Sequence, residues 1–585
     1  MTDERTVGRE PVQIVEIKQP LCQNTFGVAP CTATGTADQK CFNTRATCLD
    51  TPNFTLGTPL SLFFASGDVA ERGVSGAPYI IPSLVSVSTI PTRINIAGAN
   101  PDAQGLGNRA VCNIVLADHP HTDNRVDRYI GGRTYNPMTR GSFWTKWLAR
   151  NKYRQNVEII VYEGYIGQAL GAMKKRTYFL QSIDGQNSGG RITIQGKDIL
   201  ARIEERKSQA PVLSPGKLSA NITAGATSFS ATNCSTSDYP ASGTLRIGSE
   251  CVTYSAIAAI SGGVTFSGVT RGTDGTTAAT HSQDDQVQQC LRFTNATPDS
   301  VINTLLATYG AIPTTWLDTV NWATEVTDYM AAYRLNTLIT QPTAVSQLVS
   351  EVQENCLCFV WWDERDSLVK FKAVRGIDAP PPLISAELNI LANTFSIEEK
   401  PRERASQVWI HYGQDDRAGS ATEAKNFRYC SIIANLESET DELYGEPSLR
   451  KVFARWLSSG ALADTVASKI STRYVDIPSE CSFQMDAKDR DYWVGDTVSI
   501  SHHLDVDAYG NRRIRNWTIV SAEEVVPGEI VQYLAEDTTL YGKISFVMAA
   551  GSANYPGPAL APFKNFYIGN AAGLLSDGLP CARIT

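Results

Sequence analysis

Four cysteines near the N-terminus constrain this chain more than any other feature. They are spaced Cys22-x8-Cys31-x9-Cys41-x6-Cys48 and span 27 residues. Residues 1–60 are otherwise rich in Thr, Ala, Asn, Gly and Pro, with little periodic apolar sequence. A segment with so little apolar surface cannot order itself by burying a core. We therefore expect residues 1–60 to form a loop domain that is held together at its cysteines.

The compartment in which the chain folds affects the state of these thiols. The sequence starts Met-Thr-Asp-Glu-Arg without an apolar leader, and no run approaches the roughly 18 apolar residues of a membrane span. We expect the protein to be made and folded in a cytoplasm, without membrane insertion by this chain. The 13 cysteines are an odd number, and clustered cysteines in a reducing compartment are more often metal ligands than disulfides.

The spacing of the four cysteines leaves several bound groups open. Four thiolates suit a tetrahedral zinc ion or a [4Fe–4S] cluster. Structural zinc sites usually use close cysteine pairs, whereas the longer intervals here favour a larger object. Gly27 and Gly35 allow turns that point backbone amides inward, and Lys40 and Arg45 add positive charge nearby. Disulfides formed after release and unligated thiols remain alternatives.

Length and pattern indicate a multidomain, β-rich α+β protein. A chain of 585 residues exceeds a single core, because cores stop growing at roughly 250–300 residues. The net charge is −8, and without a basic stripe we expect no sequence-specific nucleic-acid binding. The expected domains are a cysteine-rich domain (1–60), a β-rich domain (61–210), a small inserted β-module (217–292), an α+β domain (293–400), a second α+β or β-barrel-like domain (401–545) and a C-terminal extension (546–585).

Apolar residues at helical spacing interrupt the strands at a few places. We expect helices at Ser142–Asn151, from Thr297 to Gly310, after Gln341, and around Leu462, Val466 and Ile470. Cys356-Leu-Cys358 is expected on a strand, with both thiols on one face.

Motifs of known catalytic sites are missing from the sequence. None of the six histidines belongs to an HExxH motif, and there is no GxSxG motif. The acidic pairs Asp415-Asp416 and Asp284-Asp285 are expected in solvated loops rather than as an acid/base pair. Asp505 to Asn511 resembles a calcium loop, but a hairpin turn is the preferred interpretation. We therefore expect no enzyme activity, with a peptidoglycan hydrolase as a minor alternative.

The residues around the cysteines resemble a known family. The runs Cys22-Gln-Asn-Thr-Phe-Gly-Val-Ala-Pro-Cys31 and Cys41-Phe-Asn-Thr-Arg-Ala-Thr-Cys48 resemble the cysteine domain of baseplate hub or tail tip proteins of siphophages and gene transfer agents. They are similar to the two cysteine pairs of the lambda-like tail tip proteins, whose family carries a [4Fe–4S] cluster. The resemblance implies that the four ligands are Cys22, Cys31, Cys41 and Cys48.

Two further segments carry a weaker resemblance. Gly243 to Tyr254 and Gly268 to Thr276 resemble a small β-module that is common in phage tail and baseplate proteins. Within 293–545, the order helix, hairpin, helix and strands is similar to hub domains, which fold as β-barrel-like modules and assemble as trimers. Sugar binding by the module is an alternative, with Arg271, Asp274 and His281 as its candidate residues.

Together these resemblances imply a structural component of the virion tail of a long-tailed phage. The implied protein is a homotrimeric ring that closes the tail tube and rearranges to let DNA pass. Its implied partners are the distal tail protein, the tape measure protein, and central fibre or receptor-binding proteins. A structural [4Fe–4S] cluster would order the cysteine domain, with zinc as the alternative metal. A host-surface carbohydrate-binding tail protein is the main rival.

Overall fold

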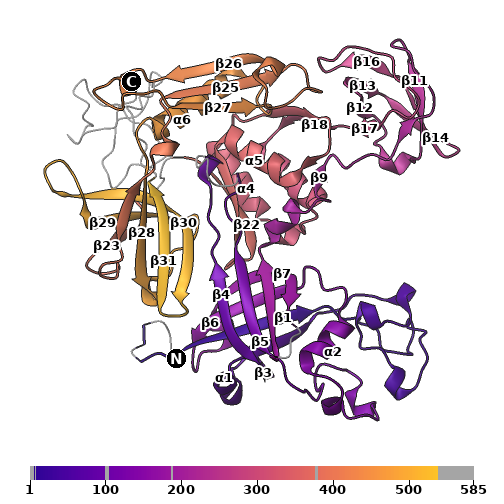
Figure 1. Ribbon diagram of the computed structural model, residues 1–585, viewed down its shortest axis with the longest axis vertical. Coiled ribbons are helices and arrows are strands. Elements are labelled where there is room, and N and C mark those ends of the chain that lie inside the picture. Colours follow the sequence, from indigo (N-terminus) through magenta and orange to yellow (C-terminus); the bar gives the residue numbers. More distant parts are fainter. Residues whose placement is uncertain (1–4, 7, 99–104, 186–188, 376–379, 538–585) are drawn as a thin grey trace.

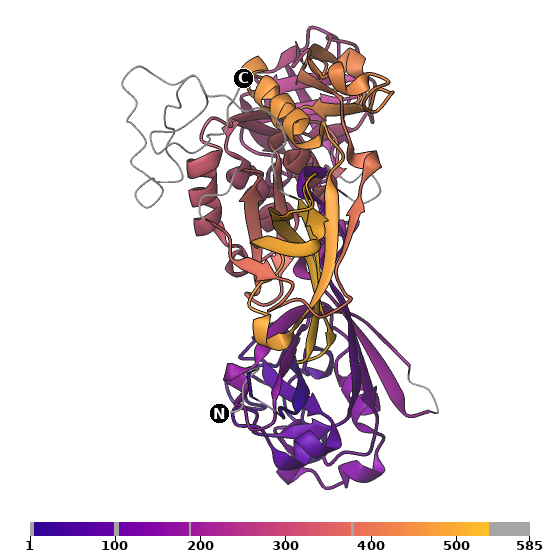
Figure 2. The same ribbon diagram turned by 90° about the vertical axis from the view of Figure 1, so that its left-hand side faces the viewer.

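The computed structural model describes residues 5–6, 8–98, 105–185, 189–375 and 380–537 (Figure 1). The expected C-terminal extension, 546–585, lies outside the described residues. The molecule is elongated, with the N-terminal sheet and the cysteine loops at one end (Figures 1 and 2). The small β-module and a three-stranded sheet lie at the other end, and a helical layer lies between (Figure 1).

The N-terminal part is built on one eight-stranded sheet, in the order β3-β2-β1-β6-β7-β8-β5-β4. All neighbours are antiparallel except β2 and β3. Strand β5 alternates buried and half-buried residues, with Cys112, Ile114 and Leu116 facing the core. The strands are β1 (Pro11–Gln19), β2 (Leu60–Ala65), β3 (Ile80–Pro82), β4 (Leu84–Ile90), β5 (Val111–Ala117), β6 (Glu158–Tyr165), β7 (Lys174–Asp184) and β8 (Arg191–Lys197).

The two ends of this sheet approach each other at Ser83, between β3 and β4. The Ser83 amide donates to the Ala65 carbonyl (3.1 Å), and the Ala117 amide donates to the Ser83 carbonyl (2.7 Å). The strand order nevertheless ends at β3 and β4. The expectation of β-barrel-like domains is therefore corrected, because no sheet formed by the described strands closes into a barrel.

Two helices accompany the sheet, α1 (Gly67–Arg72) and α2 (Phe143–Arg150). The prediction of a helix at Ser142–Asn151 is confirmed. The Thr145 hydroxyl lies 2.9 Å from the Ser142 amide, which donates to it at the helix start. Phe143, Trp144 and Trp147 are buried against the sheet.

Residues 217–289 form two small sheets that share one apolar core (Figure 1). Their orders are β10-β11-β15-β14 and β16-β13-β12-β17. Leu245, Val252 and Phe266 are fully buried between them. The strands are β10 (Lys217–Leu218), β11 (Ser228–Thr232), β12 (Gly243–Ile247), β13 (Glu250–Tyr254), β14 (Ala256–Ile260), β15 (Gly263–Ser267), β16 (Thr270–Thr273) and β17 (Val287–Gln289).

The central layer is helical, and the three helices predicted outside the N-terminal sheet are confirmed. One starts at Pro298 as α3 and continues through a wider π turn to Tyr309, directly before Gly310. Val345, Leu348, Val349 and Val352 are buried on α5 as the spacing predicts. The helices are α3 (Pro298–Asn303), α4 (Thr319–Tyr329), α5 (Val345–Cys356) and α6 (Gly460–Tyr474).

The prediction for Cys356 and Cys358 is wrong. Cys356 is the last residue of α5, and Cys358 is the first residue of the next strand, β21. Leu357 between them has φ +54°, a left-handed conformation that ends the helix. Both thiols are buried. Burial raises the pKa of the Cys356 thiol, as expected of an apolar core residue.

The remaining strands form two larger sheets and several short pairs. One sheet has the order β23-β29-β30-β31-β28-β24, and the other is β26-β25-β27, against which α6 packs. The strands are β9 (Gln209–Ala210), β18 (Leu291–Ala296), β19 (Leu335–Ile339), β20 (Thr343–Ala344), β21 (Cys358–Asp363), β22 (Leu368–Ala373), β23 (Leu383–Ser385), β24 (Ser396–Glu399), β25 (Gln407–Gln414), β26 (Phe427–Ala434), β27 (Leu449–Ala454), β28 (Ser479–Asp486), β29 (Thr497–Val506), β30 (Arg512–Val526) and β31 (Ile530–Asp537).

The two halves of the molecule are interlocked by the chain that leaves β4. Ile94 is buried in the large central core, and its amide donates to the Val520 carbonyl on β30 (2.9 Å). Arg93 forms an ion pair with Glu480 on β28 (2.5 Å). A segment of the N-terminal part therefore completes the core of the C-terminal part.

Candidate metal centre

The four predicted cysteines lie around one small cavity. Cys22, Cys31, Cys41 and Cys48 all line it, together with residues such as Asn43 and Asp50. All four are free thiols; Cys22 is buried and the other three are half-buried. The structure therefore brings together the whole predicted ligand set from four separate loops.

The other three cysteines are close enough to affect the ionisation of Cys41. Burial raises the pKa of the Cys41 thiol, and the neighbouring charges of Cys48, Cys31 and Cys22 raise it further. A hydrogen bond from the Asn43 amide acts in the opposite direction. If all four thiols were ionised they would repel one another, and a cation bound between them would offset that repulsion.

The donor set fits a thiolate-bound metal group in its chemistry, because soft metals prefer four sulfur ligands. The hollow between the cysteines, of about 10 Å³, has room for about one water molecule. Among the described residues, no three or more His, Cys, Asp or Glu side chains are grouped so that they could hold a metal ion.

Short local hydrogen bonds give the cysteine loops their shape. The Cys22 amide donates to the Asn43 carbonyl (2.7 Å), and the Asn43 side-chain amide donates to the Asn24 carbonyl (3.1 Å). Asn43 has φ +56°, a left-handed conformation that Asn tolerates better than most residues. Asp50 accepts from the Thr32 amide (2.7 Å), which ties the loop after Cys31 to the loop after Cys48.

Arg133 holds the loop that leads into Cys41. Its guanidinium donates to the carbonyls of Ala37 (3.0 Å), Asp38 (3.0 Å) and Lys40 (2.9 Å). The same group forms an ion pair with Asp127 (2.8 Å), and both side chains are fully buried. One buried cation therefore satisfies several loop carbonyls while its own charge is balanced.

Phe42 lies between two guanidinium groups. The Arg133 guanidinium is 4.5 Å and the Arg150 guanidinium 3.9 Å from the centre of its ring. Arg150 also pairs with Asp123 (2.6 Å), as does Lys146 (2.6 Å). Burial would raise the pKa of the Asp123 carboxyl, but hydrogen bonds from these groups and His121 hold it well below its usual range.

The sequence predicts that Lys40 and Arg45 supply the positive charge near the cysteines, but both lie over aromatic rings. Lys40 lies over the Tyr129 ring (5.1 Å) and Arg45 over the Phe54 ring (5.2 Å). The buried cations against the loop are instead Arg133 and Arg150. Arg133 is 92 residues from Cys41 in sequence, so no local signal marks its role.

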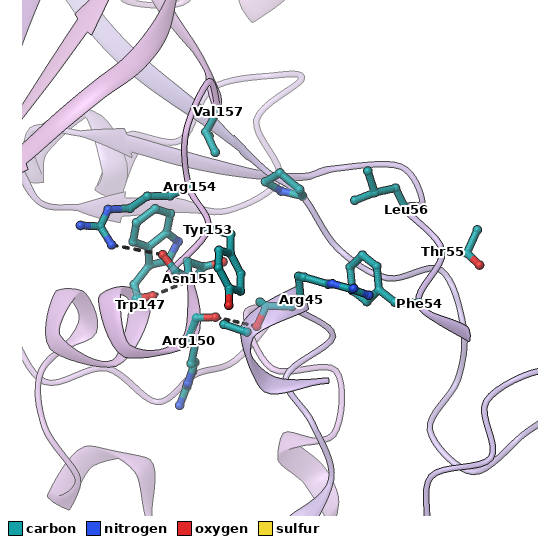
Figure 3. A pocket seen from close by; sticks show the side chains of 13 residues that line it. Arg45, Phe54, Thr55, Leu56, Trp147, Arg150, Asn151, Tyr153, Arg154 and Val157 are labelled. Atoms are coloured by element: carbon teal, nitrogen blue, oxygen red, sulfur yellow. Dashed lines mark hydrogen bonds between the residues drawn. The ribbon is translucent and has the colours of Figure 1, made fainter. Parts of the chain in front are cut away.

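A larger pocket of about 620 Å³ lies beside the cysteine loops (Figure 3). One wall is formed by Thr44–Ala46, between Cys41 and Cys48, and by Phe54–Leu56. The other wall is the end of α2 and the segment to Val157. Sequence reasoning did not predict this pocket, because its two walls are about a hundred residues apart.

The candidate sugar-binding residues of the small β-module have internal partners. The Arg271 guanidinium (2.6 Å) and the His281 imidazole (2.8 Å) both contact the Glu250 carboxylate, which is fully buried. Asp274 lies apart from them and pairs with Arg292 (2.6 Å). The polar groups proposed for a sugar therefore stabilise the module itself.

The remaining acidic candidates also have structural roles. Asp505 pairs with Arg515 (2.6 Å), and Asp507 accepts amide hydrogen bonds from Tyr509 (2.9 Å) and Asn511 (2.8 Å). The preferred hairpin turn at Asp505 to Asn511 is confirmed, since it joins β29 to β30. Asp415 pairs with Arg428, and Asp285 caps the Ser282 amide (2.9 Å).

No helix within the described ranges is long and apolar enough to cross a membrane. No family model matches the chain, and no curated protein matches it.

Several solved structures resemble the chain at low identity. A tail protein from Neisseria meningitidis MC58 is 10% identical, with a TM-score of 0.38, over 78% of this chain and 93% of that one. The 43 kDa tail protein of prophage MuSo2 from Shewanella oneidensis is 10% identical, with a TM-score of 0.34, over 77% and 97%. A chain of a native gene transfer agent particle is 10% identical, with a TM-score of 0.30, over 58% and 92%. These three solved structures are described as tail or virion proteins, and the likeness of this chain to each is remote.

Proposed function

We propose that this protein is a structural component of a phage tail, a baseplate hub or tail tip protein in the virion, with no catalytic role. The observation that carries the proposal is the convergence of Cys22, Cys31, Cys41 and Cys48 on one cavity. That convergence agrees with the ligand set implied by the resemblance to tail tip proteins. The internal pairing of the polar clusters at Glu250, Asp123 and Asp505 supports a structural rather than a catalytic role.

The proposed group at the cysteines is a [4Fe–4S] cluster with an architectural role. Residues 20–57 contribute few buried apolar side chains, so metal binding would supply much of the free energy that orders them. Cys22, Cys31, Cys41 and Cys48 would hold the group, and the Asn43 amide would donate to the Cys41 sulfur. Zinc is the alternative, since four thiolates also suit a tetrahedral zinc ion.

The proposed assembly is a homotrimeric ring that closes the tail tube. Rings of this kind form when head-to-tail contacts close under symmetry, and the number three comes from the resemblance to hub domains. The distal tail protein, the tape measure protein, and fibre or receptor-binding proteins are the proposed neighbours. Rearrangement of the ring would let DNA pass.

Metal analysis of anaerobically purified protein tests the cysteine site. For a cluster we expect brown protein with iron and acid-labile sulfide in equal amounts, and a broad absorbance at roughly 400 nm from thiolate-to-iron charge transfer. Colourless protein with stoichiometric zinc would replace the cluster by the alternative metal. Protein without either metal, in both anaerobic and reducing preparations, would contradict a metal-binding role for the four cysteines.

Sedimentation of the metal-loaded protein tests the assembly. A trimer is the expected species, and a monomer at every concentration would contradict the ring.

A zymogram with peptidoglycan tests the structural role, and clearing of the gel would contradict it.

A further inference from the structure

We infer that the pocket beside the cysteine loops is a docking site for an extended, acidic segment of a neighbouring tail protein that carries apolar side chains. The inference rests on the proposed function, since it names a contact of the proposed tail component. The pocket measures about 620 Å³ and is open at the surface (Figure 3). This volume matches the clefts that hold a drug-sized ligand or a few side chains of a peptide.

Apolar side chains form the walls, and some remain strongly exposed. Leu56 is 64% and Tyr153 is 75% exposed, and both line the pocket with Phe54. Leu49, close in sequence, is 61% exposed. Exposed aromatic and aliphatic side chains gathered at one hollow are typical of contact surfaces rather than of free protein surface.

The charge of the pocket selects an acidic occupant. Arg45, Arg150 and Arg154 line it, and no Asp or Glu does (Figure 3). Arg150 is already paired with Asp123. Neither Arg45 nor Arg154 forms an ion pair within the described part of the chain; Arg45 donates to the Thr51 carbonyl (2.7 Å) and Arg154 to the Asn151 carbonyl (3.3 Å). A guanidinium group that is not paired with a carboxylate is well suited to bind one.

The position of the pocket links docking to the cysteines. Thr44, Arg45 and Ala46 lie between Cys41 and Cys48, and the Thr44 hydroxyl donates to the Arg150 carbonyl across the base of the pocket (2.6 Å). A bound metal group that fixes this loop therefore also fixes one wall of the pocket. Metal binding at the cysteines should therefore raise the affinity of the pocket for its partner, and partner binding should raise the affinity for the metal.

Fluorescence polarisation of the full-length, metal-loaded protein tests the inference. The probe is a short fluorescein-labelled peptide of alternating leucine and aspartate, and the control peptide has lysine in place of aspartate. We expect the acidic peptide to bind at least about tenfold more tightly than the basic one. Equal affinity for the two peptides would overturn the proposal.

Matched variants locate the binding. Arg154→Glu and Tyr153→Ser change exposed or half-buried side chains, and each should weaken peptide binding at least about tenfold. The control is Arg191→Glu at the start of β8, an exposed cation on another surface, which should leave the affinity unchanged. Unchanged affinity in both pocket variants, with retained thermal stability, would overturn the docking site.

Two further readouts separate this inference from the proposed function. Removal of the metal should weaken peptide binding if the loop forms the wall, whereas metal content itself reports on the cysteine site alone. Loss of self-association in Arg154→Glu, without peptide binding to the unmodified protein, would assign the pocket to a second copy and overturn the acidic partner.

Discussion

Arg133 Nε lies 2.8 Å from Asp127 Oδ2, and neither side chain is exposed. The same guanidinium donates to the backbone that leads into Cys41. A single ion pair in the loops before α2 therefore supports the proposed metal centre from outside the cysteine region. The dependence of the cysteine loop on this pair can be measured.

Replacement of Arg133 by Gln should destabilise the N-terminal part and weaken metal retention. The change leaves the Asp127 carboxylate buried without its cation, which typically costs about 3–5 kcal/mol, and removes donors from several loop carbonyls. Chemical denaturation and metal content after dialysis measure the two effects. Arg128→Gln, an exposed arginine one residue after Asp127, is the matched control. Equal stability of both variants would contradict this role.

Replacement of Cys41 by Ser should reduce metal content and loosen the cysteine loops. A hydroxyl is a poor ligand for soft metals, so metal affinity should fall by more than roughly tenfold. Metal analysis and limited proteolysis of residues 20–57 check this result. Cys430→Ser removes an exposed thiol from β26 and should change neither. Retained stoichiometric metal in Cys41→Ser would exclude Cys41 as a ligand.

Asp198 should make the stability of the protein depend on pH. It is buried at the start of the turn Ile199–Glu204, and burial raises the pKa of its carboxyl from 3.8 to about 6. The folded state holds this proton more tightly than the unfolded state does. The contribution of Asp198 to the free energy of unfolding is therefore fully present below about pH 4 and is lost as the pH rises to about 6. The free energy of unfolding of the unmodified protein should therefore fall by about 3 kcal/mol relative to that of Asp198→Asn over this range.

Urea denaturation at a series of pH values measures that difference. Asn keeps the acceptor that caps the Ala201 amide (3.1 Å in Asp198) and does not ionise. Asp198→Ala, which lacks the cap, should lose about 1 kcal/mol at low pH. A constant difference between Asn and Asp across the pH series would show that Asp198 does not carry the dependence.

Glu250 should be required for the folding of the small β-module. The Glu250→Gln substitution leaves the Arg271 guanidinium, which is 5% exposed, without a carboxylate, at a cost of about 3 kcal/mol. The Glu250 carboxyl has a pKa lowered to about 2, because hydrogen bonds from Arg271 and His281 outweigh the effect of burial. Its contribution is thus present above about pH 4.5 and lost as the pH falls to about 2.

Thermal unfolding of the intact protein reports on the module, and Glu423→Gln, in an exposed pair with Lys425, is the control. The unmodified protein should show no binding in a glycan pull-down, since Arg271 and His281 are used internally. Glycan binding that Glu250→Gln abolishes would favour the carbohydrate-binding rival.

The features that could be predicted from the sequence are the local ones. The helix at Phe143–Arg150 follows from apolar residues at helical spacing after Ser142, and the turn at Asp507 follows from its Asp and Gly. The convergence of the four cysteines could be expected because they are close in sequence. The break at Leu357 was missed, because a left-handed residue between a helix and a strand has no signal when it is not Gly or Asn.

The partners of the candidate residues could not be predicted, because they come from distant segments. Glu250 lies 31 residues from His281, and Arg133 lies far from the cysteines in sequence. Whether a sheet closes into a barrel depends on the pairing of its first and last strands. The residue pattern of β3 and β4 does not encode that pairing.

The crossing of Ile94 onto Val520 has a mechanical consequence. Because a piece of the first half is built into the second, a load applied at the cysteine end passes through shared core and paired strands to β30 rather than through a flexible tether. Any opening of the proposed tail assembly would then come from rigid-body tilting of whole subunits against one another.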